Sequence, residues 1–175
     1  MSLSLRLPEN QARRLSQELR CEAGDFLAQR RAVAGLGLVS AGIMGLIAFY
    51  QLGLLKHLPE PPLPKMSTDK VTASPEAYAL LATPDAVLGL GSYAVTIGLA
   101  ATGAKDRARS QPWIPLVLAA KTFGDTFQAA RLALAEWRKN KALCFWCLVA
   151  ATATFATPML ALPEAREAWR NLRSE

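Results

Sequence analysis

Two cysteines three residues apart, Cys144 and Cys147 in the sequence Cys-Phe-Trp-Cys, are the side chains of this chain best suited to chemistry. A pair at this spacing can close a small disulfide ring and reopen it by thiol exchange. The pair opens an uncharged run, residues 142–163, directly after a basic segment. At the first turn of a helix, unpaired N–H groups and the positive end of the dipole favour a thiolate. The pattern therefore predicts a redox-active dithiol.

The run that carries the dithiol is one of four segments long enough to cross a bilayer. Residues 32–51 and 86–104 are also uncharged, and residues 112–137 are apolar apart from a few charges. Each segment has the ~20 residues that a helix needs to cross a ~30 Å hydrocarbon core. We expect an all-α integral membrane protein, built as a four-helix bundle.

Two charges inside the third candidate span, Lys121 and Asp125, are one helical turn apart. They would form an ion pair if they face the bundle interior. Charges within a membrane helix often mark a function, whereas charges near an interface extend toward water. We interpret the pair as structural and keep a functional role as the alternative.

Basic residues beside the spans indicate the orientation. With both termini inside, these are Arg6, Arg13, Arg14, Arg20, Arg30, Arg31, Lys105, Arg107, Arg109, Arg166, Arg170 and Arg173 on the inner side. The outer segments hold half as many: Lys56, Lys65, Lys70, Arg138, Lys139 and Lys141. We therefore expect a multi-pass protein of the cell membrane with both termini cytoplasmic and the dithiol outside. Basic flanks that meet anionic lipid account for the net charge of +6, and no nucleic-acid partner is expected.

The segments outside the spans divide the chain into three parts. Residues 1–31 form a cytoplasmic arm, in which residues 8–31 have the spacing of an amphipathic helix on the inner membrane surface. A solvated helical arm is the alternative. No cleavable signal peptide is expected, so the first span is interpreted as a signal anchor. The membrane domain covers residues 32–163, and residues 164–175 are a cytoplasmic tail.

The longest loop follows the first span and contains the proline-rich segment 59–64, a stiff extended spacer. A short helix is predicted after it, over residues 74–81. Ser74 would cap this helix, and Pro75 would take its first position. We expect this outer helix to lie across the end of the bundle and to cover the thiols.

The order of these features resembles the vitamin K epoxide reductase family. The resemblance consists of four spans, an outer loop after the first, and Cys-x-x-Cys at the start of the fourth. Local similarity is found at residues 69–78, 84–93 and 143–148, and the whole covers about residues 32–163. It implies that the protein reduces or oxidises a quinone of ubiquinone or menaquinone type. It also implies disulfide exchange with thiols on the outer side of the membrane.

The resemblance also implies roles for single residues. Cys147 would face the quinone, and Cys144, nearer water, would exchange electrons with a partner dithiol. Ser74 matches a serine of the family's quinone pocket. Asp85 stands where the family often has an asparagine that hydrogen-bonds the quinone oxygen, and an aspartate donates such a bond only when it is protonated.

This chain departs from the family pattern in its loop and in its pocket. Family members usually carry two further cysteines in the outer loop that relay electrons to the motif. Here Thr68 stands in one such place, and residues 53–85 contain no cysteine. Ala151 replaces a tyrosine that the family often presents to the pocket. Cys21 would lie on the cytoplasmic side, where an inert thiol is expected.

Three readings of the dithiol follow. In the first, the protein is a membrane thiol-disulfide/quinone oxidoreductase that exchanges electrons directly with an exported thioredoxin-like protein. In the second, it is a non-catalytic four-helix membrane module derived from the same family. In the third, Cys144 and Cys147 are ordinary small apolar residues. We expect no metal site, because His57 is the only further soft ligand on that face.

Overall fold

The computed structural model describes residues 8–21, 24–62, 66–78 and 82–174. Their regular structure is helical, apart from one isolated β-bridge between Met66 and Leu143. The elements are α1 (Glu9–Cys21), α2 (Leu27–Gln51), α3 (Thr68–Thr72), the 3₁₀ helix η1 (Pro75–Tyr78), α4 (Asp85–Ala101), α5 (Arg107–Ser110), α6 (Trp113–Asn140) and α7 (Phe145–Ser174). The prediction of an all-α chain is confirmed.

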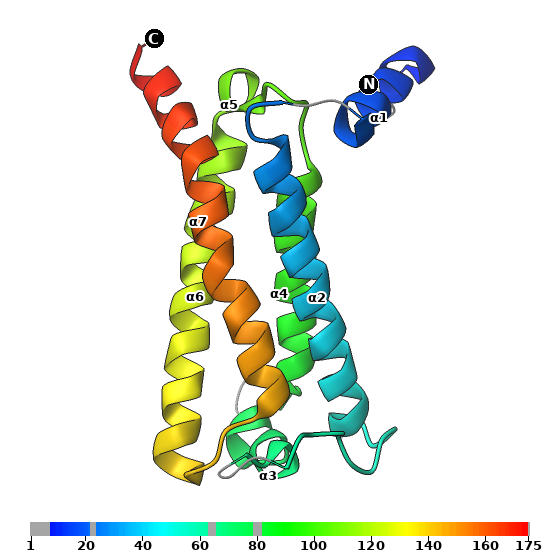
Figure 1. Ribbon diagram of the computed structural model, residues 1–175, viewed down its shortest axis with the longest axis vertical. Coiled ribbons are helices and arrows are strands. Elements are labelled where there is room, and N and C mark those ends of the chain that lie inside the picture. Colours follow the sequence, from blue (N-terminus) through cyan, green and yellow to red (C-terminus); the bar gives the residue numbers. More distant parts are fainter. Residues whose placement is uncertain (1–7, 22–23, 63–65, 79–81, 175) are drawn as a thin grey trace.

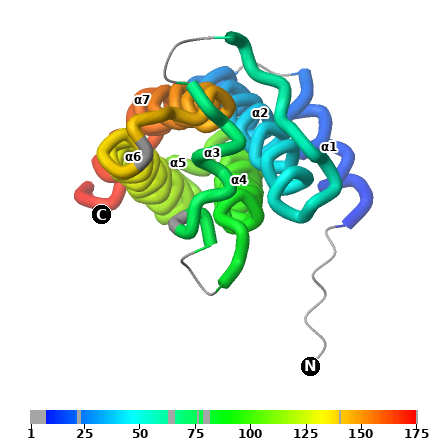
Figure 2. The backbone as a smooth tube through the Cα atoms, turned by 90° about the horizontal axis from the view of Figure 1, so that it is seen from below, coloured from blue at the N-terminus to red at the C-terminus, as the bar shows by residue number. Residues whose placement is uncertain are grey.

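The four long helices α2, α4, α6 and α7 pack side by side and run alternately up and down (Figure 1). Figure 2, seen along the bundle from the α3 end, shows them arranged around a common axis. The short helix α3 lies at one end, together with the start of α7. Helix α1, α5 and the last turns of α7 lie at the other end. The dithiol is therefore at the opposite end of the bundle from α1 and the C-terminal turns.

Two of these helices, α2 and α7, are long and apolar enough to cross a membrane, by length and composition. Helix α4 is apolar but has only 17 residues. Large apolar side chains also point outward from all four long helices, among them Leu38, Val95, Phe127 and Met159. An outward-facing apolar surface of this kind is expected where helices meet lipid tails. A bundle that crosses the membrane four times remains a prediction.

The predicted helix over residues 8–31 is wrong as one unit. Helix α1 ends at Cys21 and has no buried residue, whereas α2 begins at Leu27, whose side chain is buried in the bundle. The spacing of apolar residues continued across this break because both helices carry leucines. Only α1 forms the arm, and its position on a membrane surface remains a prediction.

Helix α7 continues past Pro158 and Pro163 and includes most of the predicted tail. A proline inside a helix leaves the carbonyl four residues earlier without its usual donor. At Pro158 that carbonyl belongs to Thr154, and it accepts hydrogen bonds from the Thr157 hydroxyl (2.8 Å) and the Thr126 hydroxyl (3.3 Å). These hydroxyls replace the missing N–H, so the helix runs on.

Two buried arginines hold the end of α4. Arg30 donates to the carbonyls of residues 100, 102, 103 and 104, at 2.9–3.1 Å. Arg107, whose side chain is 0% exposed, donates to carbonyls of the same turn and forms a two-point ion pair with Glu164, with both N–O distances 2.7 Å. The last carbonyls of a helix need such donors. Arg30 and Arg107 therefore form hydrogen bonds within the bundle. Our interpretation of these two side chains as flanking charges that meet lipid is wrong.

The outer helix predicted over residues 74–81 is formed in its first part as the 3₁₀ helix η1, which begins at Pro75 and follows α3. Residues 79–81 of the prediction lie outside the described residues. The backbone carbonyl of Ser74 accepts the Ala77 N–H (3.0 Å), which closes this turn.

Candidate functional site

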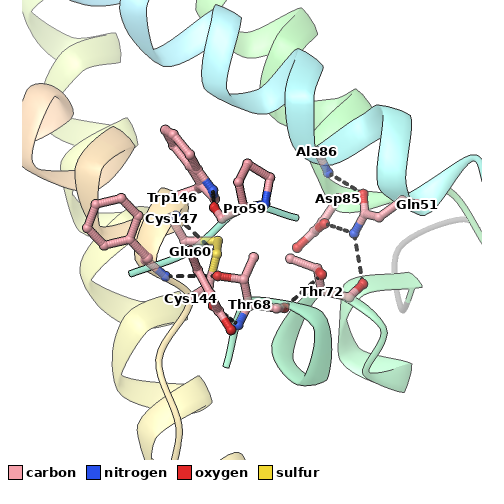
Figure 3. Close-up of a disulfide and its surroundings, with 11 residues drawn as sticks. Gln51, Pro59, Glu60, Thr68, Thr72, Asp85, Ala86, Cys144, Trp146 and Cys147 are labelled. Carbon is pink, nitrogen blue, oxygen red and sulfur yellow. Dashed lines mark hydrogen bonds between the residues drawn. A yellow bond between two sulfur atoms is a disulfide. The ribbon is translucent and has the colours of Figure 1, made fainter. Parts of the chain in front are cut away.

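Cys144 and Cys147 are joined by a disulfide where α7 begins (Figure 3). Cys144 directly precedes the helix, and the Cys147 N–H points to its sulfur at 3.1 Å. This N–H is one of the donors that a helix leaves free at its first turn. The arrangement supports the expectation that the helix start favours a thiolate at Cys144.

The two sulfurs differ in access. Cys144 is 0% exposed, and Cys147 is only partly buried. The expectation that Cys144 is the exposed sulfur is wrong for this disulfide form. An incoming thiolate needs a clear path to the sulfur it attacks, so Cys144 is closed to a protein partner in this conformation.

Cys144 is closed because the loop after α2 lies over it. We call its described residues 57–62 and 66–72 the cover. The Ser67 N–H donates to the Leu143 carbonyl (3.1 Å), and the Trp146 indole N–H donates to the Pro59 carbonyl (2.7 Å). Within the cover, the Thr68 N–H donates to the Glu60 carboxylate at 2.7 Å. The thiols are covered as predicted, and among the described residues the contacts with the motif come from the cover.

Thr68 lies directly against the redox motif (Figure 3). It is fully buried, and its hydroxyl accepts the Phe145 N–H at 3.3 Å, one residue after Cys144. The resemblance implied a relay cysteine at this position. The position is thus beside the disulfide, but it carries a hydroxyl that serves the start of α7.

A cavity of about 570 Å³ reaches Cys147 from inside the bundle. All four long helices, α3 and η1 contribute to its wall, which is mainly apolar. The residues that line it are Met44, Ile47, Val71, Thr72, Ala77, Thr83, Asp85, Ala86, Leu88, Gly89, Ser92, Tyr93, Asp125, Gln128, Ala129, Arg131, Leu132, Ala133, Glu136, Cys147, Leu148, Ala150 and Ala151. Its volume, and a mainly apolar wall with a few polar groups, are typical of small-molecule binding sites.

Asp85 begins α4 and lines this cavity, and its role in quinone binding remains a prediction. The Gln51 amide holds it: the Gln51 side-chain N–H group donates to Asp85 Oδ1 (2.7 Å) and to the Thr72 carbonyl (3.1 Å). The Gln51 oxygen accepts the Ala86 N–H at 3.3 Å (Figure 3). Sequence reasoning missed Gln51, because it ends a different helix and 34 residues separate it from Asp85.

The other residues assigned by resemblance lie as follows. Ser74 is buried, but the described cavity lining contains Thr72 and not Ser74. The pocket role of Ser74 remains a prediction. Ala151 does line the cavity. A different tyrosine, Tyr93 of α4, also lines it, and its hydroxyl is 2.7 Å from the Thr154 hydroxyl.

The predicted pair of Lys121 and Asp125 is formed, with its shortest N–O distance 2.6 Å. Both side chains are 19% exposed, and hydroxyls of α4 complete the cluster. The Lys121 ammonium donates to Ser92 Oγ (2.9 Å), and the Ser92 and Thr96 hydroxyls donate to Asp125 (3.2 Å each). The pair therefore ties α6 to α4. Its hydrogen bonds favour the structural interpretation, which remains a prediction.

Glu136 is a further acidic residue of the cavity that sequence reasoning missed. It lies in the last turns of α6, and its carboxyl interacts with the backbone N–H of Cys144. The signal was present in the sequence, since Glu136 is an acidic residue within the third candidate span. Its place beside the dithiol depends on how α6 and α7 pack.

Comparison with protein-family models matches residues 31–162 to the family described as Vitamin K epoxide reductase family. The chain belongs to this family. The matched segment includes the dithiol, the cover and every residue that lines the cavity. Members of this family are in general membrane oxidoreductases associated with quinone substrates. Comparison with curated proteins and comparison with solved structures each found no significant match.

Proposed function

We propose that this protein is a membrane thiol-disulfide/quinone oxidoreductase. The observation that carries the proposal is the position of Cys147 on the wall of a mainly apolar cavity between the helices of the bundle. The dithiol and a quinone suffice to balance the reaction. A reduced Cys144–Cys147 pair gives two electrons and two protons to a quinone, so that a disulfide and a hydroquinone result. The reverse reaction uses the same groups.

The quinone, of ubiquinone or menaquinone type, would occupy the cavity with its ring near Cys147. Asp85 is already oriented by Gln51 and would hydrogen-bond a quinone oxygen while it is protonated. Apolar side chains of four helices would surround the ring and exclude water. The quinone would enter from the lipid phase, where such molecules dissolve.

The other half of the cycle would be disulfide exchange with an exported thioredoxin-like protein at Cys144. Since the cover closes this sulfur, we propose that exchange takes place only when the cover opens. The opening must break the contacts of Ser67 with Leu143 and of Trp146 with Pro59. In the proposed topology, the cover faces the outside of the cell membrane, and both termini face the cytoplasm.

A non-catalytic membrane module is the second candidate. Three observations favour it: Cys144 is buried, Thr68 occupies the relay position, and Ala151 stands where the family often has tyrosine. In this reading the disulfide is structural and the cover stays closed. The cavity would then hold lipid.

Mass-tag alkylation separates the two candidates. The purified protein is reduced in detergent, mixed with a quinone and then alkylated, alongside Cys144→Ser and Cys147→Ser. Quinone-dependent protection of both thiols in the wild type supports the oxidoreductase. Thiols that alkylate equally with and without quinone support the non-catalytic module. Trapping adds the partner: Cys147→Ser should leave Cys144 in a mixed disulfide, whereas Cys144→Ser should not.

A further inference from the structure

The proposed reaction moves protons as well as electrons, and the cavity must provide for both. A thiol attacks as its thiolate, so the pair must lose its protons before or during the reaction. The two oxygens of the quinone must gain two protons. Most of the cavity wall is apolar. A side chain that accepts a proton at the sulfur and returns it to the quinone would serve both needs.

The cavity offers few groups for this task. Its ionisable lining residues, besides Cys147, are Asp85 and Tyr93 from α4 and Asp125, Arg131 and Glu136 from α6. Those from α2, α3 and η1 have no ionisable side chain: they are Met44, Ile47, Val71, Thr72 and Ala77.

Three of these groups are poorly suited. Arginine stays charged at all ordinary pH values and does not carry protons. The Tyr93 hydroxyl is already engaged in a hydrogen bond with the Thr154 hydroxyl. Asp125 is bound by Lys121 and lies 11 residues before Glu136, about 16 Å further along α6 at 1.5 Å per residue.

Glu136 has the position that the task requires. It lines the cavity that Cys147 lines, and its carboxyl interacts with the backbone N–H of Cys144. Glu136 is therefore next to the Cys144 backbone, and it shares with Cys147 the cavity in which the quinone would bind. Asp85, the other candidate, is held through one of its oxygens by Gln51. We propose that Glu136 is the proton carrier of the thiol–quinone reaction, a role that rests on the proposed function.

In the step that we propose, Glu136 begins as a carboxylate and takes the proton of the Cys147 thiol. The sulfur then gives its electrons to the quinone, and Glu136 returns the proton to a quinone oxygen. The second thiol proton goes to the other quinone oxygen as the disulfide closes. When the reaction runs backward, Glu136 takes a proton from the hydroquinone and gives it to the sulfur. The carboxyl ends each cycle in the state in which it began.

A purely structural role is the competing explanation. The Cys144 N–H lies at the start of α7, and a carboxylate there stabilises a helix through its free N–H groups. Glu136→Gln separates the two roles. The amide oxygen of glutamine still accepts the N–H hydrogen bond, whereas the amide carries no proton to exchange.

The test is the rate at which a short-chain quinone oxidises the reduced protein in detergent, measured from pH 6 to pH 9.5. We expect Glu136→Gln to lower the rate about 100-fold near pH 6.5, which lies within the usual contribution of a general acid–base group. The deficit should shrink to a few-fold near pH 9.5, where the thiol ionises unaided. Glu167→Gln, the same change at a carboxylate of α7 outside the cavity lining, is the control and should match the wild type.

Each other outcome overturns the assignment. A Glu136→Gln variant with the rate and pH profile of the wild type removes Glu136 from the reaction. A deficit that stays constant across the pH range indicates a structural role. A pH-dependent deficit in Asp85→Asn alone would make Asp85 the carrier. If quinone oxidises neither variant nor wild type, the proposed function is itself wrong, and that result differs from all the others.

Discussion

The cover over Cys144 should control how fast the disulfide reacts with a reductant from outside. The Trp146 indole N–H is a hydrogen-bond donor to the cover, at 2.7 Å from the Pro59 carbonyl. Trp146→Phe removes this bond and keeps an aromatic ring. A hydrogen bond of this kind contributes about 1 kcal/mol net, and about 1.4 kcal/mol is a factor of ten in population. We expect the open population, and with it the rate, to rise about fivefold.

A second substitution in the cover should have a larger effect. Glu60 accepts the Thr68 N–H at 2.7 Å, and bonds to charged groups contribute about 2 kcal/mol. Glu60→Ala should therefore raise the rate about thirtyfold. The two bonds hold different parts of the cover, so the double variant should show the product of the two effects if they act independently.

The assay is the rate of disulfide reduction by a charged, water-soluble phosphine, followed by mass-tag alkylation. Such a reductant stays out of the apolar cavity and must reach Cys144 through the cover. Trp169→Phe, the same change at an exposed tryptophan near the other end of α7, is the control. Rates that stay at the wild-type value in both cover variants would refute the reasoning. That result would mean that the reductant reaches the disulfide by another route.

Two further predictions concern residues that act at a distance from the dithiol. Gln51→Leu should weaken quinone binding about tenfold, because Asp85 loses the amide that orients it. Fluorescence titration with a quinone measures this affinity, and an unchanged affinity would contradict the prediction. Glu164→Leu should lower the melting temperature in detergent by about 10 °C, because it leaves Arg107 buried without its partner at a cost of about 3–5 kcal/mol. An equal change in Glu167→Leu, at a more exposed ion pair, would contradict this account.

Local patterns in the sequence predicted the features that depend on near neighbours. The spacing of Cys144 and Cys147 suffices for a disulfide, and the four-residue spacing of Lys121 and Asp125 suffices for an ion pair. Both are formed. Long apolar runs located the four helices of the bundle, although the ends of α2 and α7 were misplaced. Helix ends depend on partners such as Thr126 at Pro158, which composition does not reveal.

Features that depend on distant segments were missed. The burial of Cys144 depends on a cover more than 70 residues earlier in the chain. Gln51 reaches Asp85 from another helix, and Glu136 reaches Cys144 only through the packing of α6 against α7. Arg30 looked like a membrane flank because its carbonyl partners lie 70 to 74 residues away. Side-chain type and spacing carry no information on such pairs.

The disulfide can be reached from two sides, the cavity and the cover. The difference between these sides helps to explain how the protein could work without the loop cysteines. The cavity opens on Cys147, whereas the cover closes Cys144. A cover held by about 3 kcal/mol would still open in about 1% of molecules, since local segments of proteins open with free energies of this order. Exchange with a partner thiol would then be slower by that factor, but its chemistry would be unchanged. If the proposed function is right, a threonine at position 68 would slow only the exchange with outer thiols and would leave the quinone side as it is.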